Sequence, residues 1–311
     1  MSADGATRDS AGPPAGVVRT PDERFAALPD FPWAPRYTTV AGMRMAHVED
    51  GPPAADPVLL LHGEPTWSFL YRKMIPPLAA AGHRAVAPDF LGFGRSDKPT
   101  DRAAYSYAGH VAWMTEWLDA LALQRVTLVC QDWGSLIGLR LVAAMPERFA
   151  RVVLANGGLP DGRGKPPLAL KTWIAFAKHT PILPIGKIVR GGCTRGLAAG
   201  AVAAYDAPFP DNASKAGARA FPTLIPLSPD APGAAENRAA WDALRGFEKP
   251  FLCAYSSGDP ITRGADRRFR EQVPGAQGRS HVTIGDAGHF LQEDAGAELA
   301  RVVIDFIAGT R

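Results

Sequence analysis

The sequence predicts an α/β protein with a mostly parallel sheet that is flanked by helices and interrupted by a helical insertion. Short apolar segments alternate with segments of helical spacing as far as Gly157, and the alternation resumes at Pro250. Strands that alternate with helices are typical of parallel sheets. Between these two points the chain is rich in Pro, Gly and Ala and has no comparable apolar strand. We therefore expect a core with a helical cap, and a ligand pocket between the two.

Each element is predicted from the spacing of its apolar residues. Strands are expected where a short apolar run leads into a loop, at 58–61, 84–88, 126–130, 152–155, 250–255 and 281–284. Helices are expected where apolar residues recur with helical spacing, at 68–81, 107–123, 136–144, 168–178 and 298–307. Pro76-Pro77 predicts a break inside the first of these helices.

The composition is that of a globular protein without a strong charge bias. Of 311 residues, 46% are hydrophobic and 21% are charged, which excludes disorder of the whole chain. The net charge is +3 and no Lys/Arg run is long enough to follow a phosphate backbone, so a nucleic-acid partner is not expected. No apolar stretch reaches the roughly 18 residues that span a bilayer, and a membrane partner is not expected either.

Cysteine usage and the N-terminus indicate a reducing, cytoplasmic setting. Cys130, Cys193 and Cys253 form no C-x-x-C pair, so neither a disulfide framework nor a zinc site is expected. The N-terminus lacks the basic start and apolar segment of a signal peptide. We expect four segments: a flexible tail at 1–16, a first core part at 17–157, a cap at 158–229 and a second core part at 230–311.

The most informative segment is the strand-to-helix junction around Asp132. An apolar strand from Val126 meets a helix through Cys130-Gln131-Asp132-Trp133-Gly134. Cys130 and Gly134 are the small flanks that a tight turn requires. This pattern is a nucleophile elbow with Asp in place of Ser, and the helix N-terminus favours an anion. We therefore expect Asp132 to be a nucleophile and not only an N-cap.

The remaining catalytic groups are predicted from loops that follow strands. In the elbow architecture, a backbone N–H after an early strand joins the N–H after the nucleophile, here Glu64 and Trp133, to form an oxyanion hole. Asp259 follows one late strand and His289 follows the next. The order nucleophile, acid, histidine is the one that this architecture requires. The chain has no Gly-x-Ser-x-Gly motif, so a serine esterase is disfavoured.

These residues resemble the haloalkane dehalogenases of the α/β-hydrolase superfamily, over about 18–307. Four strings carry the resemblance in the expected order: His62-Gly63-Glu64-Pro65-Thr66-Trp67, Phe90-Leu91-Gly92-Phe93-Gly94-Arg95-Ser96-Asp97-Lys98-Pro99, Gln131-Asp132-Trp133-Gly134 and Ala287-Gly288-His289-Phe290. The resemblance implies an α/β-hydrolase fold. It also implies hydrolysis of a halogenated alkane to a primary alcohol, a halide ion and a proton through an ester on Asp132. No metal or other cofactor is implied, and a monomer is expected.

The resemblance also implies how the halide and the substrate are held. In one subfamily, the Trp after the nucleophile and a Trp of the cap donate N–H groups to the halide, and Glu follows His-Gly. The matching residues are Trp133, Trp173 and Glu64. Phe209 and Pro210 resemble a cap segment that lines the substrate pocket.

Two alternatives remain. Epoxide hydrolases share the Asp-Trp-Gly string and use cap tyrosines, normally two, as acids, whereas this insertion holds one, Tyr205. A binding protein that senses a ligand with the same fold is the other alternative, although it would have no need for all three catalytic residue types.

Overall fold

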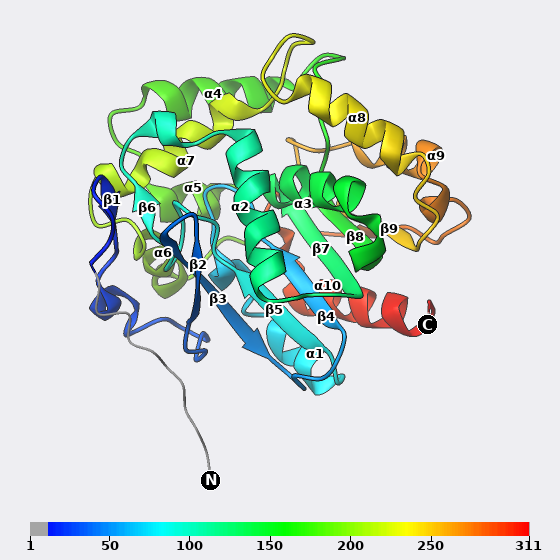
Figure 1. The fold of residues 1–311 in the computed structure, drawn as a ribbon, viewed down its shortest axis with the longest axis horizontal. Coiled ribbons are helices and arrows are strands. Elements are labelled where there is room, and N and C mark those ends of the chain that lie inside the picture. The colour runs from blue at the N-terminus through cyan, green and yellow to red at the C-terminus, as the bar shows by residue number, and fades with distance from the viewer. Residues whose placement is uncertain (1–11, 311) are drawn as a thin grey trace.

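The computed structural model describes residues 12–310, so most of the predicted tail, residues 1–11, lies outside the described part. An eight-stranded sheet forms the centre, in the order β10-β9-β8-β7-β4-β5-β3-β2 (Figure 1). In this sheet, β3 (Met43–Asp50) runs antiparallel to both of its neighbours, β2 (Arg36–Val40) and β5. The other neighbouring strands are parallel. The predicted fold class is therefore confirmed.

The parallel strands are the ones that the apolar runs predicted. They are β4 (Pro57–Leu61), β5 (Arg84–Pro88), β7 (Val126–Asp132), β8 (Phe149–Gly157), β9 (Phe251–Ser256) and β10 (Val282–Ile284). The central strand β4 is buried along its whole length, as expected for a parallel strand covered on both faces. A separate ribbon pairs β1 (Val17–Val18) with β6 (Lys98–Pro99).

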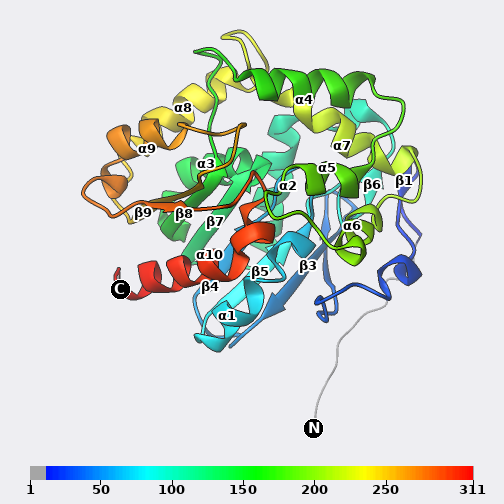
Figure 2. The same ribbon diagram turned by 180° about the vertical axis from the view of Figure 1, so that it is seen from behind.

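Helices cover both faces of this sheet (Figures 1 and 2). On one face α3 contacts both α2 and α8, and on the other α1 packs against α10. These helices and the neighbouring α9 are α1 (Ile75–Ala80), α2 (Tyr107–Ala120), α3 (Trp133–Ala144), α8 (Ala234–Leu244), α9 (Asp266–Gln272) and α10 (Leu291–Ala308). Short 3-10 helices connect the elements: η1 (Asp22–Phe25), η2 (Ser68–Tyr71), η3 (Arg102–Ala104), η4 (Pro146–Arg148), η5 (Ala213–Lys215), η6 (Phe221–Leu224) and η7 (Pro274–Ala276).

The first predicted helix is wrong in detail. Residues 68–81 form two pieces, η2 and α1, and the break lies before Pro76-Pro77. Both prolines fall in the first turn of α1, where an N–H has no intrahelical partner and its absence costs little. Pro76 and Pro77 therefore lie at the start of α1 and do not break a continuous helix.

Between β8 and β9 the chain leaves the sheet and forms α4 (Leu168–His179), α5 (Ile185–Gly191), α6 (Ala199–Asp206) and α7 (Ala216–Ala220). This helical block lies beside the carboxyl ends of the parallel strands (Figure 2). No strand occurs between 158 and 229, in agreement with the predicted helical character, and the cap boundaries stay a prediction. Within residues 12–310, no helix combines the length and the apolarity needed to cross a bilayer.

Candidate active site

Asp132 occupies a sharp turn where β7 ends and α3 begins. Its backbone has φ 49° and ψ −126°, a conformation that costs a non-glycine residue about 1–3 kcal/mol. A Cβ on Gly134 would lie 2.1 Å from the Leu61 carbonyl oxygen, and one on Gly63 would lie 2.4 Å from the Cβ of Asp132. The turn is therefore pressed against β4 and the loop after it. This close approach is the physical reason for the glycines in both strings.

The loop after β4 holds the Asp132 carboxylate from one side. The Glu64 backbone N–H donates to Asp132 Oδ1 at 2.8 Å. The Trp133 backbone N–H lies in the first turn of α3, where N–H groups have no partner within the helix. Of the two predicted oxyanion donors, Glu64 thus contacts the Asp132 carboxylate, and Trp133 directly follows Asp132 at the start of α3. Donors in this arrangement stabilise negative charge that develops on a carboxyl-derived oxygen.

His289 lies between the two predicted carboxylates. Its Nε2 is 3.5 Å from Asp132 Oδ2, and its Nδ1 is 3.1 Å from Asp259 Oδ2. Asp259 also accepts hydrogen bonds from the Ile261 N–H at 2.8 Å and from the Thr262 hydroxyl. The structure thus brings the three residues of the predicted triad together at the ends of three different strands.

The charges around His289 change its protonation. Burial lowers its pKa, but Asp259 and Asp132 outweigh burial and raise the pKa to about 10. Burial likewise opposes ionisation of Asp259, yet His289 and the hydrogen bonds to this carboxylate hold its pKa below the ordinary value. Asp259 and Asp132 therefore both favour the imidazolium form of His289.

Trp133 presents a free donor at the same place. Its side chain is 2% exposed, and its indole Nε1 has no hydrogen-bond partner among the described residues. The ring is fixed by edge and tilted contacts with Tyr107 and Phe221, at centroid distances of 5.2 and 4.6 Å. A buried N–H without a partner is costly. A fixed donor of this kind suits an anion that is present only during the reaction.

Trp173 reaches the site from α4 and faces Glu64. The Trp173 side chain favours the charged form of the Glu64 carboxyl group, but burial and Asp132 outweigh it and raise the pKa of Glu64 well above the ordinary value. Glu64 Oε1 has no partner.

A cavity of about 350 Å³ lies between core and cap and contains these groups. We call it the core–cap cavity. Asp132, Trp133, Trp173 and His289 lie on its wall together with apolar side chains, which include Leu170, Ile188, Ile225 and Phe290. A mostly apolar wall with a few ionisable groups is typical of a site that binds a small molecule.

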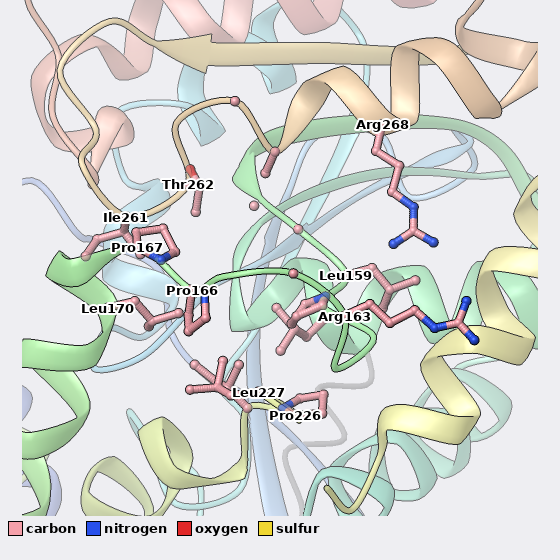
Figure 3. Close-up of a pocket in the computed structure, with 18 of the residues that line it drawn as sticks. Leu159, Arg163, Pro166, Pro167, Leu170, Pro226, Leu227, Ile261, Thr262 and Arg268 are labelled. Atoms are coloured by element: carbon pink, nitrogen blue, oxygen red, sulfur yellow. The ribbon is translucent and has the colours of Figure 1, made fainter. Parts of the chain in front are cut away.

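A second cavity of about 390 Å³ adjoins the first, and we call it the outer cavity. The two cavities share the residues Asp132, Leu170, Ile225 and Ile261. Figure 3 shows the outer cavity, with Pro166, Pro167 and Leu170 on one side and the guanidinium groups of Arg163 and Arg268 at one end. Leu170, Ile225 and Ile261, which the outer cavity shares with the core–cap cavity, make its wall apolar near Asp132.

The predicted pocket residues Phe209 and Pro210 do not line either cavity. Phe209 is buried against Phe93, with ring centroids 6.5 Å apart, and Pro210 is exposed. The segment after α6 packs on the loop before β6 instead of turning towards Asp132. This prediction is wrong, and residues of α4 and of the loop after η6 take the place that it assigned.

Tyr205 is also remote from the nucleophile. Its hydroxyl donates to Glu293 Oε1 at 2.5 Å, and Glu293 is bound at the same time by Arg72. No described tyrosine lines either cavity. The acid that the epoxide-hydrolase alternative requires is therefore missing from the site.

Two residues that the sequence did not single out hold the loop of His289. Asn156 donates from Nδ2 to the carbonyl oxygen of Gly288 at 2.9 Å and accepts the Ser256 N–H at 2.8 Å. Asp294 accepts the backbone N–H groups of Gly288 at 2.8 Å and of Thr194, in the cap, at 2.8 Å. Neither residue stands in a string with a recognisable pattern, because both act on backbone groups.

Comparison with known proteins agrees with this geometry. Residues 56–296 match the family model of the alpha/beta hydrolase fold. A haloalkane dehalogenase of Mycobacterium marinum is 52% identical over 295 residues, which are 93% of this chain and 99% of the relative. This chain is a member of the haloalkane dehalogenase family. A haloalkane dehalogenase of Psychrobacter cryohalolentis is 49% identical, covering 94% of this chain and 98% of the relative.

Solved structures place the fold in the same family. The tetrameric haloalkane dehalogenase DpaA from Paraglaciecola agarilytica NO2 superposes with a TM-score of 0.86 at 35% identity and covers 92% of this chain and 97% of its own. The protein is a hydrolase that acts on carbon–halide bonds. The family predicted from the four strings is thereby confirmed.

Proposed function

We propose that this haloalkane dehalogenase works through an alkyl ester on Asp132, with His289 as base, Asp259 as its partner, and Trp133 and Trp173 as halide donors. One observation carries the proposal. The His289 ring stands between Asp132 and Asp259, at 3.5 and 3.1 Å, beside the indole N–H of Trp133, which has no partner. Haloalkane and water enter, and an alcohol, a halide ion and a proton leave.

In the first step a carboxylate oxygen of Asp132 attacks the carbon that bears the halogen. The new carbon–oxygen bond forms as the carbon–halogen bond breaks, and the halide takes the bonding electron pair. The free Trp133 N–H lies in the apolar cavity with Asp132, and a hydrogen bond to an anion is strong where water is excluded. Trp173, on the wall of the same cavity, is the second donor.

In the second step His289 takes a proton from water, and the resulting hydroxide attacks the ester carbonyl carbon. The oxyanion of the tetrahedral intermediate lies where the N–H of Glu64 now holds Asp132 Oδ1 at 2.8 Å, with the Trp133 N–H beside it. Collapse of this intermediate expels the alkoxide, which takes the proton from His289 and leaves as the alcohol. The Asp132 carboxylic acid that remains then gives up its hydroxyl proton, which restores the carboxylate.

The charge of Asp132 links the two steps. Asp132 and Asp259 together raise the pKa of His289 to about 10. Esterification removes the negative charge of Asp132, and the pKa of His289 then falls because only Asp259 still favours the cation. The histidine is thus released to act as a base after the ester has formed.

The test is halide release from 1,2-dibromoethane and 1-bromobutane by the wild type and by Asp132→Ala. We expect release by the wild type and none by the variant. His289→Gln should form the ester without hydrolysing it, so that intact-mass analysis shows one added alkyl group. Absence of this adduct in a folded His289→Gln protein that still releases one equivalent of halide would contradict the assigned roles.

We also propose a cytoplasmic monomer. A tetrameric structure is described for the relative DpaA, so a tetramer is the alternative assembly. Size-exclusion chromatography with light scattering decides between a mass near the 33.0 kDa of one chain and a multiple of it.

A further inference from the structure

The first half of the cap carries charge of one sign. Between Asp161 and Asp206 the sequence has no Asp or Glu, although 31 acidic residues in 311 would place about four in these 44 positions. The same stretch contains seven basic residues, all of them exposed: Arg163, Lys165, Lys171, Lys178, Lys187, Arg190 and Arg195. A chain with a net charge of only +3 therefore concentrates positive charge on its cap.

The same part of the cap exposes large apolar side chains. Among residues 12–310, four large hydrophobic side chains count as exposed, and three of them lie here: Leu168 at 78%, Phe176 at 43% and Ile182 at 69%. The first two are on α4, and Ile182 follows it shortly after its end. Single exposed apolar residues are ordinary, but a cluster marks an interaction site.

On α4 the apolar and basic residues share the outward side. Leu168 and Phe176 are eight positions apart, and Lys171 and Lys178 are seven apart, so each pair recurs after about two helical turns. Ala177 is buried, and Leu170 and Trp173 lie on the wall of the core–cap cavity, so the opposite side faces the protein. We call Leu168, Lys171, Phe176, Lys178 and Ile182 the α4 face. Figure 2 shows α4 at the periphery of the molecule.

We propose that the α4 face adsorbs to the surface of an anionic lipid bilayer. Apolar side chains flanked by lysines on an exposed helix are the pattern of interfacial helices, in which the apolar groups enter the boundary of the acyl chains and the ammonium groups contact phosphates. The absence of acidic residues from 162–205 removes the repulsion that such a surface would otherwise exert. The proposal departs from the expectation that the protein has no membrane partner. That expectation rested on the absence of a spanning segment, which adsorption does not need.

The α4 face lies next to the outer cavity, so adsorption would affect how substrate reaches the site. Lys165, Pro166 and Pro167, just before α4, and Leu170, in its first turn, line the outer cavity. Figure 3 shows the last three of these residues. An adsorbed α4 would bring this wall next to the lipid, into which apolar haloalkanes partition. This last consequence rests on the proposed function, whereas adsorption itself does not.

Sedimentation with vesicles tests the proposal. Full-length protein is mixed with vesicles of phosphatidylcholine alone or with phosphatidylglycerol at three to one, at low and at high salt. We expect the wild type to sediment with the anionic vesicles at low salt and to remain in solution with the neutral ones. Lys171→Glu/Lys178→Glu should weaken partitioning by about 25-fold or more, because each basic residue near the surface contributes about fivefold.

A matched control carries the same charge change on another exposed helix. Arg267 and Arg270 lie on α9, where each is paired with an acidic residue, Glu271 or Asp266. Arg267→Glu/Arg270→Glu should bind the anionic vesicles within about twofold of the wild type. An equal loss in both double variants would overturn the proposal, because the attraction would then follow net charge and not the α4 face.

The apolar part is tested by Leu168→Ser/Phe176→Ser/Ile182→Ser. We expect this variant to lose the partitioning that survives at high salt and to keep the salt-sensitive part. Failure of the wild type to prefer anionic vesicles would refute the proposal. A dimer of the wild type that light scattering detects, and that the serine variant no longer forms, would also refute it, since a second copy would then cover the α4 face. Halide release from water-soluble 2-bromoethanol should be unchanged in all variants, which separates failure of adsorption from failure of the catalytic assignment.

Discussion

Replacement of Asp294 by Asn tests whether the cap and the loop of His289 are held by one carboxylate. Asp294 is 7% exposed and accepts three backbone N–H groups, those of Gly288, Thr194 and Arg195, each at 2.8 Å. Asn keeps one oxygen as an acceptor. Its NH2 group replaces the other oxygen and faces the backbone N–H groups that this oxygen accepted. At least one charge-assisted hydrogen bond is lost, at about 1.5–3 kcal/mol, and a buried donor is left facing another. We expect Asp294→Asn to lower the free energy of unfolding by about 2–4 kcal/mol.

The kinetic effect should fall on the second step. Gly288 directly precedes His289, so release of its N–H loosens the ring that must activate water, whereas Asp132 is held separately by the Glu64 N–H. A displacement near 1 Å at a reacting group costs on the order of a hundredfold. We therefore expect a burst of halide release near the wild-type rate and a slower steady state. Rapid quenching followed by mass analysis should show the alkyl adduct accumulating during turnover.

Asp97→Asn is the matched control, because Asp97 is fully buried and accepts the Arg44 N–H and the Arg19 guanidinium at 2.8–2.9 Å, away from the triad. It should lose stability without accumulating adduct. The reasoning is refuted if Asp294→Asn loses stability but slows both chemical steps equally, or if Asp97→Asn accumulates as much adduct.

Three further outcomes follow from the geometry. Trp133→Phe removes the indole N–H that has no partner among the described residues. We expect the affinity for bromide, measured by calorimetry, to fall about 10-fold to 150-fold, which is the equivalent of one hydrogen bond to an anion. Unchanged affinity would exclude Trp133 as a donor. Gly134→Ala places a Cβ 2.1 Å from the Leu61 carbonyl oxygen, and circular dichroism should show a protein that unfolds at much lower temperature or does not fold. The pKa of His289 is raised from 6.5 to about 10 in the folded state, so the native state binds more protons than the unfolded state between these values. The contribution of His289 to stability should therefore be complete below pH 6.5 and lost as pH rises through about 10, so the difference between wild type and His289→Gln in urea unfolding should shrink across that window.

The elbow could be predicted from sequence because its geometry constrains local residue types. Gly134 is small where α3 starts close to β4, and a Cβ there would lie 2.1 Å from the Leu61 carbonyl oxygen. The placement of Asp259 and His289 followed from a general rule, that loops at the carboxyl ends of parallel strands meet at one edge of the sheet. These contacts are local or topological, so a single sequence records them.

The pocket wall and the supporting hydrogen bonds could not be predicted in the same way. Phe209 packs on Phe93 because of how the cap settles on the core, and that docking leaves no periodic pattern in the sequence. Asn156 and Asp294 bind backbone groups, which every residue type possesses. The orientation of Trp173 towards Glu64 likewise depends on the packing of α4.

The cap departs from the sheet after β8 and returns before β9, and these two strands are direct neighbours. Because these strands are parallel, the chain leaves at the carboxyl end of β8 and re-enters the sheet at the amino end of β9, with α8 between the cap and β9. An insertion within such a crossover connection can lengthen, shorten or be replaced without shifting any strand register. Asp132, Asp259 and His289 all lie outside it in the sequence. Evolution, or an engineer, can therefore remodel which molecules reach the nucleophile by changing one contiguous stretch of the gene, while the groups that break and form bonds stay in place.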